Sequence, residues 1–344
     1  MIKHQGFTLL ELMLSIVLGL LIVAAALSLF IGSGRSTNLQ TGMAELQQNA
    51  NFGLSMMAKD IRHANLNTAS NQKINKTLNG SGVIFTKANI GSATSTIETN
   101  KYVTLAANNT DGSEEGESDQ LTIQFMPQYE VSESSAVKKD ADGNEMKDPI
   151  TNNKIIVRTI KSTTNIFDCE GAKIQSAISD DGDSSRILTE SKPIVVQRYY
   201  IDELATTFQT MGTAKRFGLY CDAGRYESGA SEVSGLGANA QLVMQDIEAF
   251  KIRFGIKNSE KFRYVTVQQY MDTYGGWQII SVELGLLARS SGSIGGNQAL
   301  NTTSTYKIAG QDVVLDATTN EYKKYLRQVV TQVVGFRNTL GASL

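Results

Sequence analysis

The sequence predicts an α+β fold, in which one long N-terminal helix packs on a large C-terminal domain of antiparallel β-strands with long loops. Three observations predict it. Residues 12–31 contain no charged residue, and apolar residues then recur at helical spacing as far as residue 61. From residue 69 onward, short segments alternate between apolar and polar residues with the period of two that strands require.

The first half of the helix is long enough to cross a membrane. Twenty uncharged residues extend about 30 Å, which matches the hydrocarbon core of a bilayer. Lys3 precedes them and predicts a cytoplasmic N-terminus with an exported C-terminal part. A signal peptide cleaved near residues 24–26 and a plain membrane anchor are alternatives. Neither explains Glu11, because a carboxylate in an apolar segment costs up to about 3 kcal/mol unless it has a partner.

The second half of the helix is amphipathic. Its apolar residues lie three or four positions apart and form one stripe: Leu39, Met43, Leu46, Ala50, Leu54, Met57 and Ile61. We expect this stripe to pack on the chain's own domain. No proline interrupts residues 7–66, so one helix can run throughout. His63 is expected to be a solvated or helix-end histidine, since a metal site has no second histidine nearby.

The remainder of the chain is expected to form strands joined by long polar loops. The expected strands are residues 83–85, 102–106, 120–126, 155–160, 194–201, 217–221, 248–256, 277–287, 313–315 and 326–336. Residues 259–274 are expected to form the second helix. The expected loops are residues 67–82, 108–119, 132–153, 228–239 and 290–305.

The composition disfavours several kinds of function. A net charge of −2 lacks the basic excess of a general nucleic-acid binder. The two histidines are His4 and His63, so the domain has neither a Cys/His zinc site nor a histidine-activated nucleophile. The calcium-like spacing of Asp140, Asp142 and Asn144 lacks the required glycine and glutamate, and predicts a hairpin turn instead. We therefore predict no catalytic residue, cofactor or metal, and no enzymatic activity.

The N-terminal segment Gly6-Phe7-Thr8-Leu9-Leu10-Glu11 resembles the cleavage and methylation motif of type IV prepilins and pseudopilins. The resemblance implies that a prepilin peptidase cuts after Gly6 and that Phe7 becomes N-methylphenylalanine. Glu11 would then form a salt bridge with the N-terminal amine of a neighbouring subunit, where low dielectric strengthens the pair. The chain accordingly divides into a leader (1–6), a transmembrane and assembly helix (7–66) and an exported domain (67–344).

Three C-terminal segments resemble the minor pilins of the PilW family. Residues 246–255 are similar to an aromatic–glycine strand, residues 277–290 to a strand ending in Leu-Leu-x-Arg-Ser, and residues 325–338 to a closing strand ending in Arg-Asn. The resemblance implies a pilin-like fold and a minor pilin that takes part in initiating type IV pilus assembly and is incorporated at or near the tip of the pilus. It also implies a part in twitching motility. Arg289 and Arg337, at strand ends, are expected to form surface ion pairs of little energetic weight.

The same resemblance implies partners and a location. The partners are other minor pilins and the major pilin, met through the N-terminal helix, together with the prepilin peptidase, the inner membrane and an adhesin at the tip; no nucleic acid is implied. Before assembly, the chain would span the inner membrane once with its domain in the periplasm, and after assembly it would lie in the fibre. A J-type pseudopilin of type II secretion and a membrane-tethered periplasmic enzyme or adhesin remain alternatives.

Export to an oxidising compartment also affects the expected oxidation state of the two cysteines. In an oxidising compartment, Cys169 and Cys221 are expected to form a disulfide, with two reduced thiols as the alternative. The bond would close a loop of about fifty residues and stabilise the domain by about 4 kcal/mol in the chain-entropy model.

Overall fold

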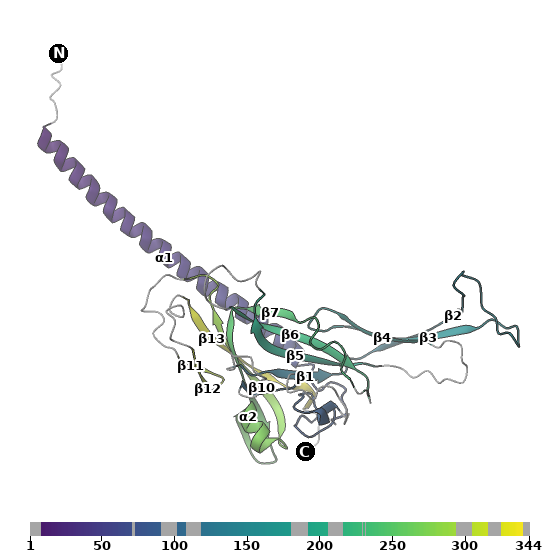
Figure 1. Cartoon of the computed structure of the whole chain (residues 1–344). Helices are drawn as coiled ribbons and strands as arrows, with labels where there is room; N and C mark the ends of the chain where they lie inside the picture. The colour runs from purple at the N-terminus through teal and green to yellow at the C-terminus, as the bar shows by residue number, and fades with distance from the viewer. Residues whose placement is uncertain are drawn as a thin grey trace.

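A computed structural model describes residues 8–70, 73–90, 102–107, 118–179, 192–205, 216–228, 230, 232–293, 305–315 and 325–339. Helix α1 (Leu9–Ile61) projects by its first half from a β-rich domain and packs on it by its second half (Figure 1). This arrangement confirms the predicted α+β fold. At 53 residues the helix is about 80 Å long.

The packed half of α1 uses the predicted stripe. Its buried residues are Gly42, Leu46, Ala50, Gly53, Leu54, Met57, Ala58 and Ile61. Met43 lies outside the contact, with 47 % of its surface exposed. Burial against the domain therefore begins at Leu39, which is half-buried, and the described helix residues before Leu39 are all exposed.

Two four-stranded antiparallel sheets form the body of the domain. The first has the order β1-β5-β6-β7, comprising β1 (Leu121–Phe125), β5 (Ile194–Glu203), β6 (Phe217–Tyr226) and β7 (Gln241–Gln245). The second has the order β13-β10-β8-β9, comprising β13 (Arg327–Gly335), β10 (Gln278–Arg289), β8 (Ile247–Lys257) and β9 (Phe262–Thr266). Helix α1 contacts β7, β10 and β13, so it crosses the junction between the two sheets.

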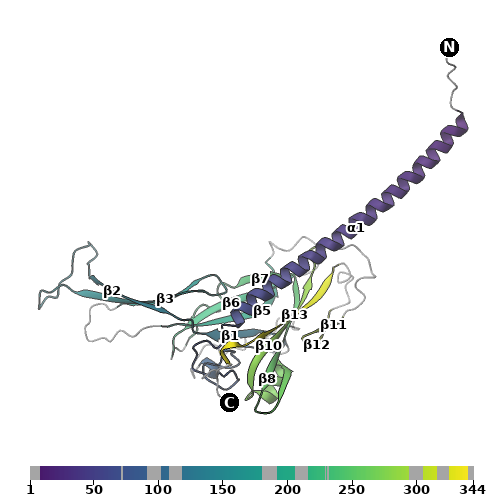
Figure 2. The ribbon, with the colours of Figure 1, turned by 180° about the vertical axis from the view of Figure 1, so that it is seen from behind.

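Two smaller sheets are attached to this body. A three-stranded arm, β2 (Glu130–Val137), β3 (Ile156–Phe167) and β4 (Lys173–Ser179), extends from the domain away from the projecting helix (Figures 1 and 2). The hairpin of β11 (Thr305–Ile308) and β12 (Gln311–Val314) packs Ile308 and Val313 against Ala249 and Leu287. The hairpin thus covers one face of the second sheet.

The structure corrects several element predictions. Strands β2, β4 and β7 were not expected, and β2 lies partly in the predicted loop 132–153. Every residue of β2 is exposed or half-buried, so its sequence carries no alternation to detect. The predicted helix 259–274 contains strand β9 followed by α2 (Val267–Gln269) and one π turn, η5 (Tyr270–Tyr274).

Only isolated β-bridges form where the first two strands were expected, at residues 83–85 and 102–106. Val83 pairs with Ile123, and Leu105 pairs with Gln120. Two short 3₁₀ turns complete the described elements, η1 (Lys87–Ile90) and η7 (Arg337–Thr339).

Candidate functional site: the N-terminal helix and its junction with the domain

Glu11 caps the helix on which it lies. Its carboxylate accepts hydrogen bonds from the Thr8 backbone N–H (3.1 Å) and hydroxyl (3.1 Å), while the Glu11 N–H donates to the Thr8 hydroxyl (3.2 Å). This reciprocal capping box satisfies otherwise unpaired donors at the start of α1. The predicted cleavage and methylation residues, Gly6 and Phe7, lie outside the described residues. In the single chain, the helix terminus is thus the partner of Glu11.

The projecting half of α1 exposes an unbroken apolar surface. Its large apolar side chains from Leu9 to Ile31 are 52–78 % exposed. In the described part of the chain, α1 is the one helix long and apolar enough to cross a membrane, and its most apolar window has no buried residue. An exposed apolar surface of this size is typical of a segment that lies in lipid or packs on other helices.

A glycine lets the packed half of α1 approach β7 closely. A Cβ atom placed on Gly53 would lie 2.0 Å from Cγ and 2.1 Å from Sδ of Met244, whose side chain is buried. The helix can therefore lie this close to β7 because residue 53 has no side chain. This contact is one of those that hold α1 against the domain, together with its contacts to β10 and β13.

Gly53→Leu should separate α1 from β7 and destabilise the domain by about 3 kcal/mol, because overpacking outweighs the gain of about 1 kcal/mol in helix propensity. Thermal unfolding of the full chain measures the loss. Gly53→Leu combined with Met244→Ala should recover part of it, because the smaller side chain makes room. If the single and double variants are equally destabilised, the contact does not position the helix.

The C-terminal end of α1 is held by the closing segment of the chain. The Asn338 side-chain amide donates to the carbonyl oxygens of Arg62 (3.1 Å) and Ala64 (2.9 Å), which lack helical partners. Asn65, in the turn that follows the helix, has φ of +66°, a left-handed conformation that asparagine tolerates. Asn338 is the last residue of the tail segment noted in the sequence, but its role depends on a contact across the whole domain.

A second set of contacts holds the last turn of α1 on the first sheet. The Tyr199 hydroxyl donates to Asp60 Oδ2 at 2.7 Å, and the His63 ring lies 5.4 Å from that of Phe125. Burial raises the pKa of Asp60 and lowers that of His63, so it favours the neutral imidazole. His63 is thus the helix-end histidine that the sequence predicted, although it is half-buried rather than solvated.

A buried charge cluster forms where the chain passes from β7 into β8. Asp246, at φ of +57°, accepts a hydrogen bond from Arg216 Nε (2.8 Å) and forms an ion pair with Arg289 (3.3 Å). Glu248 in turn pairs with Arg327 and Arg289. The prediction of Arg289 as a surface ion pair was wrong: its side chain is 5 % exposed, because its partners come from the sheet junction beneath α1.

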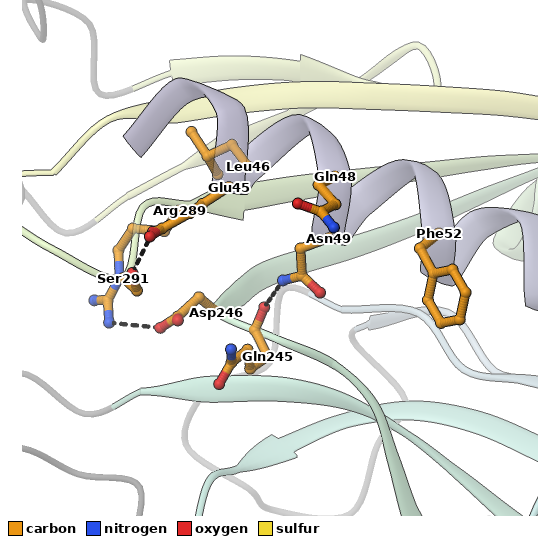
Figure 3. A pocket seen from close by; sticks show the side chains of 9 residues that line it. All are labelled: Glu45, Leu46, Gln48, Asn49, Phe52, Gln245, Asp246, Arg289 and Ser291. Atoms are coloured by element: carbon orange, nitrogen blue, oxygen red, sulfur yellow. Dashed lines mark hydrogen bonds and ion pairs between the residues drawn. The ribbon is translucent and has the colours of Figure 1, made fainter. Parts of the chain in front are cut away.

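A groove runs between α1 and this charge cluster (Figure 3). Its volume is about 550 Å³. The helix wall carries Glu45, Leu46, Gln48, Asn49 and Phe52, and the opposite wall carries Gln245, Asp246, Arg289 and Ser291. Two hydrogen bonds cross it: Asn49 Nδ2 donates to the Gln245 carbonyl (2.8 Å), and the Ser291 hydroxyl donates to Glu45 Oε2 (2.7 Å). Nothing in the sequence pattern indicated this groove.

The predicted disulfide joins Cys169 and Cys221, with their Cα atoms 6.1 Å apart. Cys169 lies in the turn between β3 and β4, and Cys221 lies in β6, so the bond ties the arm to the first sheet. The adjacent ion pair between Asp168 and Arg225 (2.6 Å) supports the same attachment. The disulfide is therefore a covalent cross-link between the two parts, in addition to the backbone that joins them.

The acidic segment at Asp140 is a turn, as the sequence predicted. Asp140 Oδ1 accepts from the N–H groups of Asp142 and Asn144, and Gly143 has φ of +87°. Within the described residues, no group of three or more His, Cys, Asp or Glu side chains is arranged to hold a metal ion.

Comparison with family models gives two matches. Residues 198–338 match PilW, the Type IV Pilus-assembly protein W, and residues 1–27 match the prokaryotic N-terminal methylation motif. The first match contains Asp246, Arg289 and Asn338, and the second contains Gly6 and Glu11. Neither the curated proteins nor the solved structures include a match to the chain. The two family matches confirm the resemblance seen in the sequence, and together with the apolar helix they support a minor pilin of the type IV pilus.

Proposed function

We propose that this minor pilin takes part in initiating assembly of the pilus and is incorporated at or near the tip. The observation that carries the proposal is the exposed apolar half of α1, which follows Glu11 and continues in one helix into the half that packs on a large domain. A helix of this kind is stored in the inner membrane, with the domain in the periplasm, and moves sideways into a bundle of similar helices. It is a structural element, and enzymatic chemistry plays no part in this role.

The shape of the domain supports a position at the end of the fibre. The arm extends well beyond the two sheets, in a direction different from that of α1 (Figures 1 and 2). Subunits in a helical filament repeat the same contacts, so a protruding arm is accommodated best where no subunit stacks above it. The partners in this proposal are other minor pilins and the major pilin, and the prepilin peptidase that processes the N-terminus. A J-type pseudopilin is less favoured, because those proteins are shorter.

The capping box allows a sharp test of Glu11. Glutamine at this position keeps the cap but carries no charge, whereas Thr8→Ala removes a cap contact and keeps the charge. If Glu11 pairs with the amine of a neighbouring subunit, Glu11→Gln should lower the amount of the chain in sheared fibres by about tenfold, since a tenfold change corresponds to about 1.4 kcal/mol.

The control variant Thr8→Ala should stay within about twofold of the wild type, because it removes an exposed cap contact of the single chain and leaves the charge of Glu11 in place. Immunoblots of fibre and membrane fractions measure both variants. Equal incorporation of Glu11→Gln and the wild type would mean that Glu11 serves only as a helix cap.

A further inference from the structure

The outer edge of strand β2 is unpaired in the single chain. Strand β2 forms one side of the arm, whose strand order is β2-β3-β4 (Figure 1). Lys138 continues the register of β2 with β3, and its N–H donates to the Ile155 carbonyl at 2.8 Å. In an antiparallel pair, successive residues direct their backbone groups alternately toward and away from the partner strand. The outward-directed N–H and C=O groups are therefore those of Val131, Glu133, Ser135 and Val137. Within the described part of the chain, no backbone hydrogen bond joins these groups to another segment.

This edge lacks most of the features that keep exposed strands from pairing with other chains. Natural edge strands are commonly short, bulged, or interrupted by proline or lysine. Strand β2 has eight residues, contains neither proline nor lysine, and pairs with β3 without a shift in register. Its one protective feature is a pair of charged residues, Glu130 and Glu133. An edge of this length and regularity is a template for a further strand.

The aliphatic side chains of the arm lie on one of its faces. Alternate residues of a strand share a face, and the register extends that face from β2 to β3 and β4. The face carries Val131, Val137, Ile156, Ile160 and Ile178. Val131 and Ile156 are 49 % and 56 % exposed, so the strands of the arm leave this surface uncovered. A strand added beside β2 would extend the face and bury part of it with aliphatic side chains at its own alternate positions.

The arm is fixed at its base by contacts within the chain. The disulfide joins the β3–β4 turn to β6, and Asp168 pairs with Arg225 beside it at 2.6 Å. The Tyr129 hydroxyl, immediately before β2, donates to the Pro193 carbonyl at 2.6 Å. A strand edge that is already held in the extended conformation loses little conformational entropy on pairing. The arm lies outside residues 198–338, the part that the family model matches.

The charge of β2 indicates the kind of strand that it pairs with. Glu130 and Glu133 are exposed, and neither forms an ion pair with another described residue. Opposite charges on neighbouring strands attract one another, whereas like charges repel. A second copy of β2 has no basic residue to offer, because residues 130–137 contain only these two charges. A strand of a different protein, with basic side chains, is therefore the better match.

We propose that the outer edge of β2 receives an extended strand of a different protein. That strand carries aliphatic side chains at alternate positions and a lysine or arginine next to Glu133. The inference goes beyond the proposed function, because it concerns the arm and not the N-terminal helix.

A photo-crosslinking amino acid at position 131 tests the pairing in cells that make the full chain. Position 161, exposed on the central strand β3 and on the opposite face of the arm, is the control. The product from position 131 should contain a segment of another protein, and mass spectrometry should locate the bond in a stretch with alternating aliphatic residues and a basic residue. Position 161 should not yield the same segment. Membrane and fibre fractions are measured separately.

Two substitutions in β2 show whether the contact is strand pairing. Ser135→Pro removes an outward N–H that β3 does not use, and should lower the crosslinked fraction at position 131 by about tenfold. Ser135→Ala keeps this N–H and should stay within about twofold of the wild type. Glu133→Lys leaves the backbone unchanged but repels a basic partner strand, and should also lower the fraction by about tenfold. Membrane levels and non-reduced mapping of the disulfide report whether each variant folds.

The proposal would be contradicted by a product that joins two copies of this chain, or by a crosslinked fraction that Ser135→Pro and Glu133→Lys leave unchanged. The absence of any product from a chain that is present in the fibres would contradict it as well. These outcomes leave the pilin function intact. A chain that is missing from fibres but crosslinked at position 131 in the membrane fraction would instead reject the proposed function and retain the pairing at β2.

Discussion

Replacing Gly6 with isoleucine is expected to leave the chain as an unprocessed precursor and to remove it from surface fibres. The predicted peptidase cuts after this residue, and a glycine lets the backbone approach closely where a branched side chain would block it. An uncut leader also keeps Lys3 next to the apolar helix, where a buried cation costs about 3 kcal/mol and opposes movement into the bundle.

Immunoblotting separates the precursor from the mature chain by the six residues of the predicted leader. Gly276→Ile is a suitable control, because Gly276 is exposed and a Cβ there meets nothing within 4 Å. Normal piliation with Gly6→Ile, or a product cut near residues 24–26, would favour a plain anchor or a signal peptide over the prepilin interpretation.

Removing the disulfide by Cys169→Ala and Cys221→Ala is expected to have the largest effect on stability. The bond closes a loop of 52 residues, for which the chain-entropy model gives a loss of about 4 kcal/mol. In a domain of this size, that loss lowers the Tm by on the order of 10 °C. Because Cys221 is fully buried in the main core, part of the loss comes from packing as well.

Thermal unfolding of the full chain in detergent, with and without a reductant, measures this effect. The reductant should bring the wild type close to the double variant and leave the variant unchanged. A shift of less than about 1 kcal/mol would show that the ion pair between Asp168 and Arg225 and the core contacts hold the arm without the bond.

The sequence predicted the parts of the molecule that depend on local patterns. The helix follows from an uninterrupted apolar period, and Glu11 follows from its spacing from Gly6. The disulfide was predictable because the chain has only two cysteines and the N-terminus indicates export. Each of these inferences uses residues that are close in sequence or few in number.

The junction between helix and domain was not predictable in the same way. Asn338 binds carbonyl groups some 275 residues earlier, and Arg289 meets Asp246 across the sheet junction. Which residues meet depends on the order of the strands and on the left-handed residue Asp246 between β7 and β8. No periodic pattern in the sequence indicates the strand order or the conformation of Asp246. The arm was missed for a different reason: a sheet exposed on both faces needs no apolar alternation, so β2 reads as a polar loop.

A minor pilin must be present in the fibre in its processed form. Tryptic digestion of purified fibres should yield a peptide that starts at Phe7, carries one added methyl group on its N-terminus and ends at Arg35, the first cleavable residue of the mature chain. Mass spectrometry detects this peptide. Fibres that lack the chain, or a chain whose N-terminus is Met1 or lies near residue 26, would contradict the identification of a minor pilin.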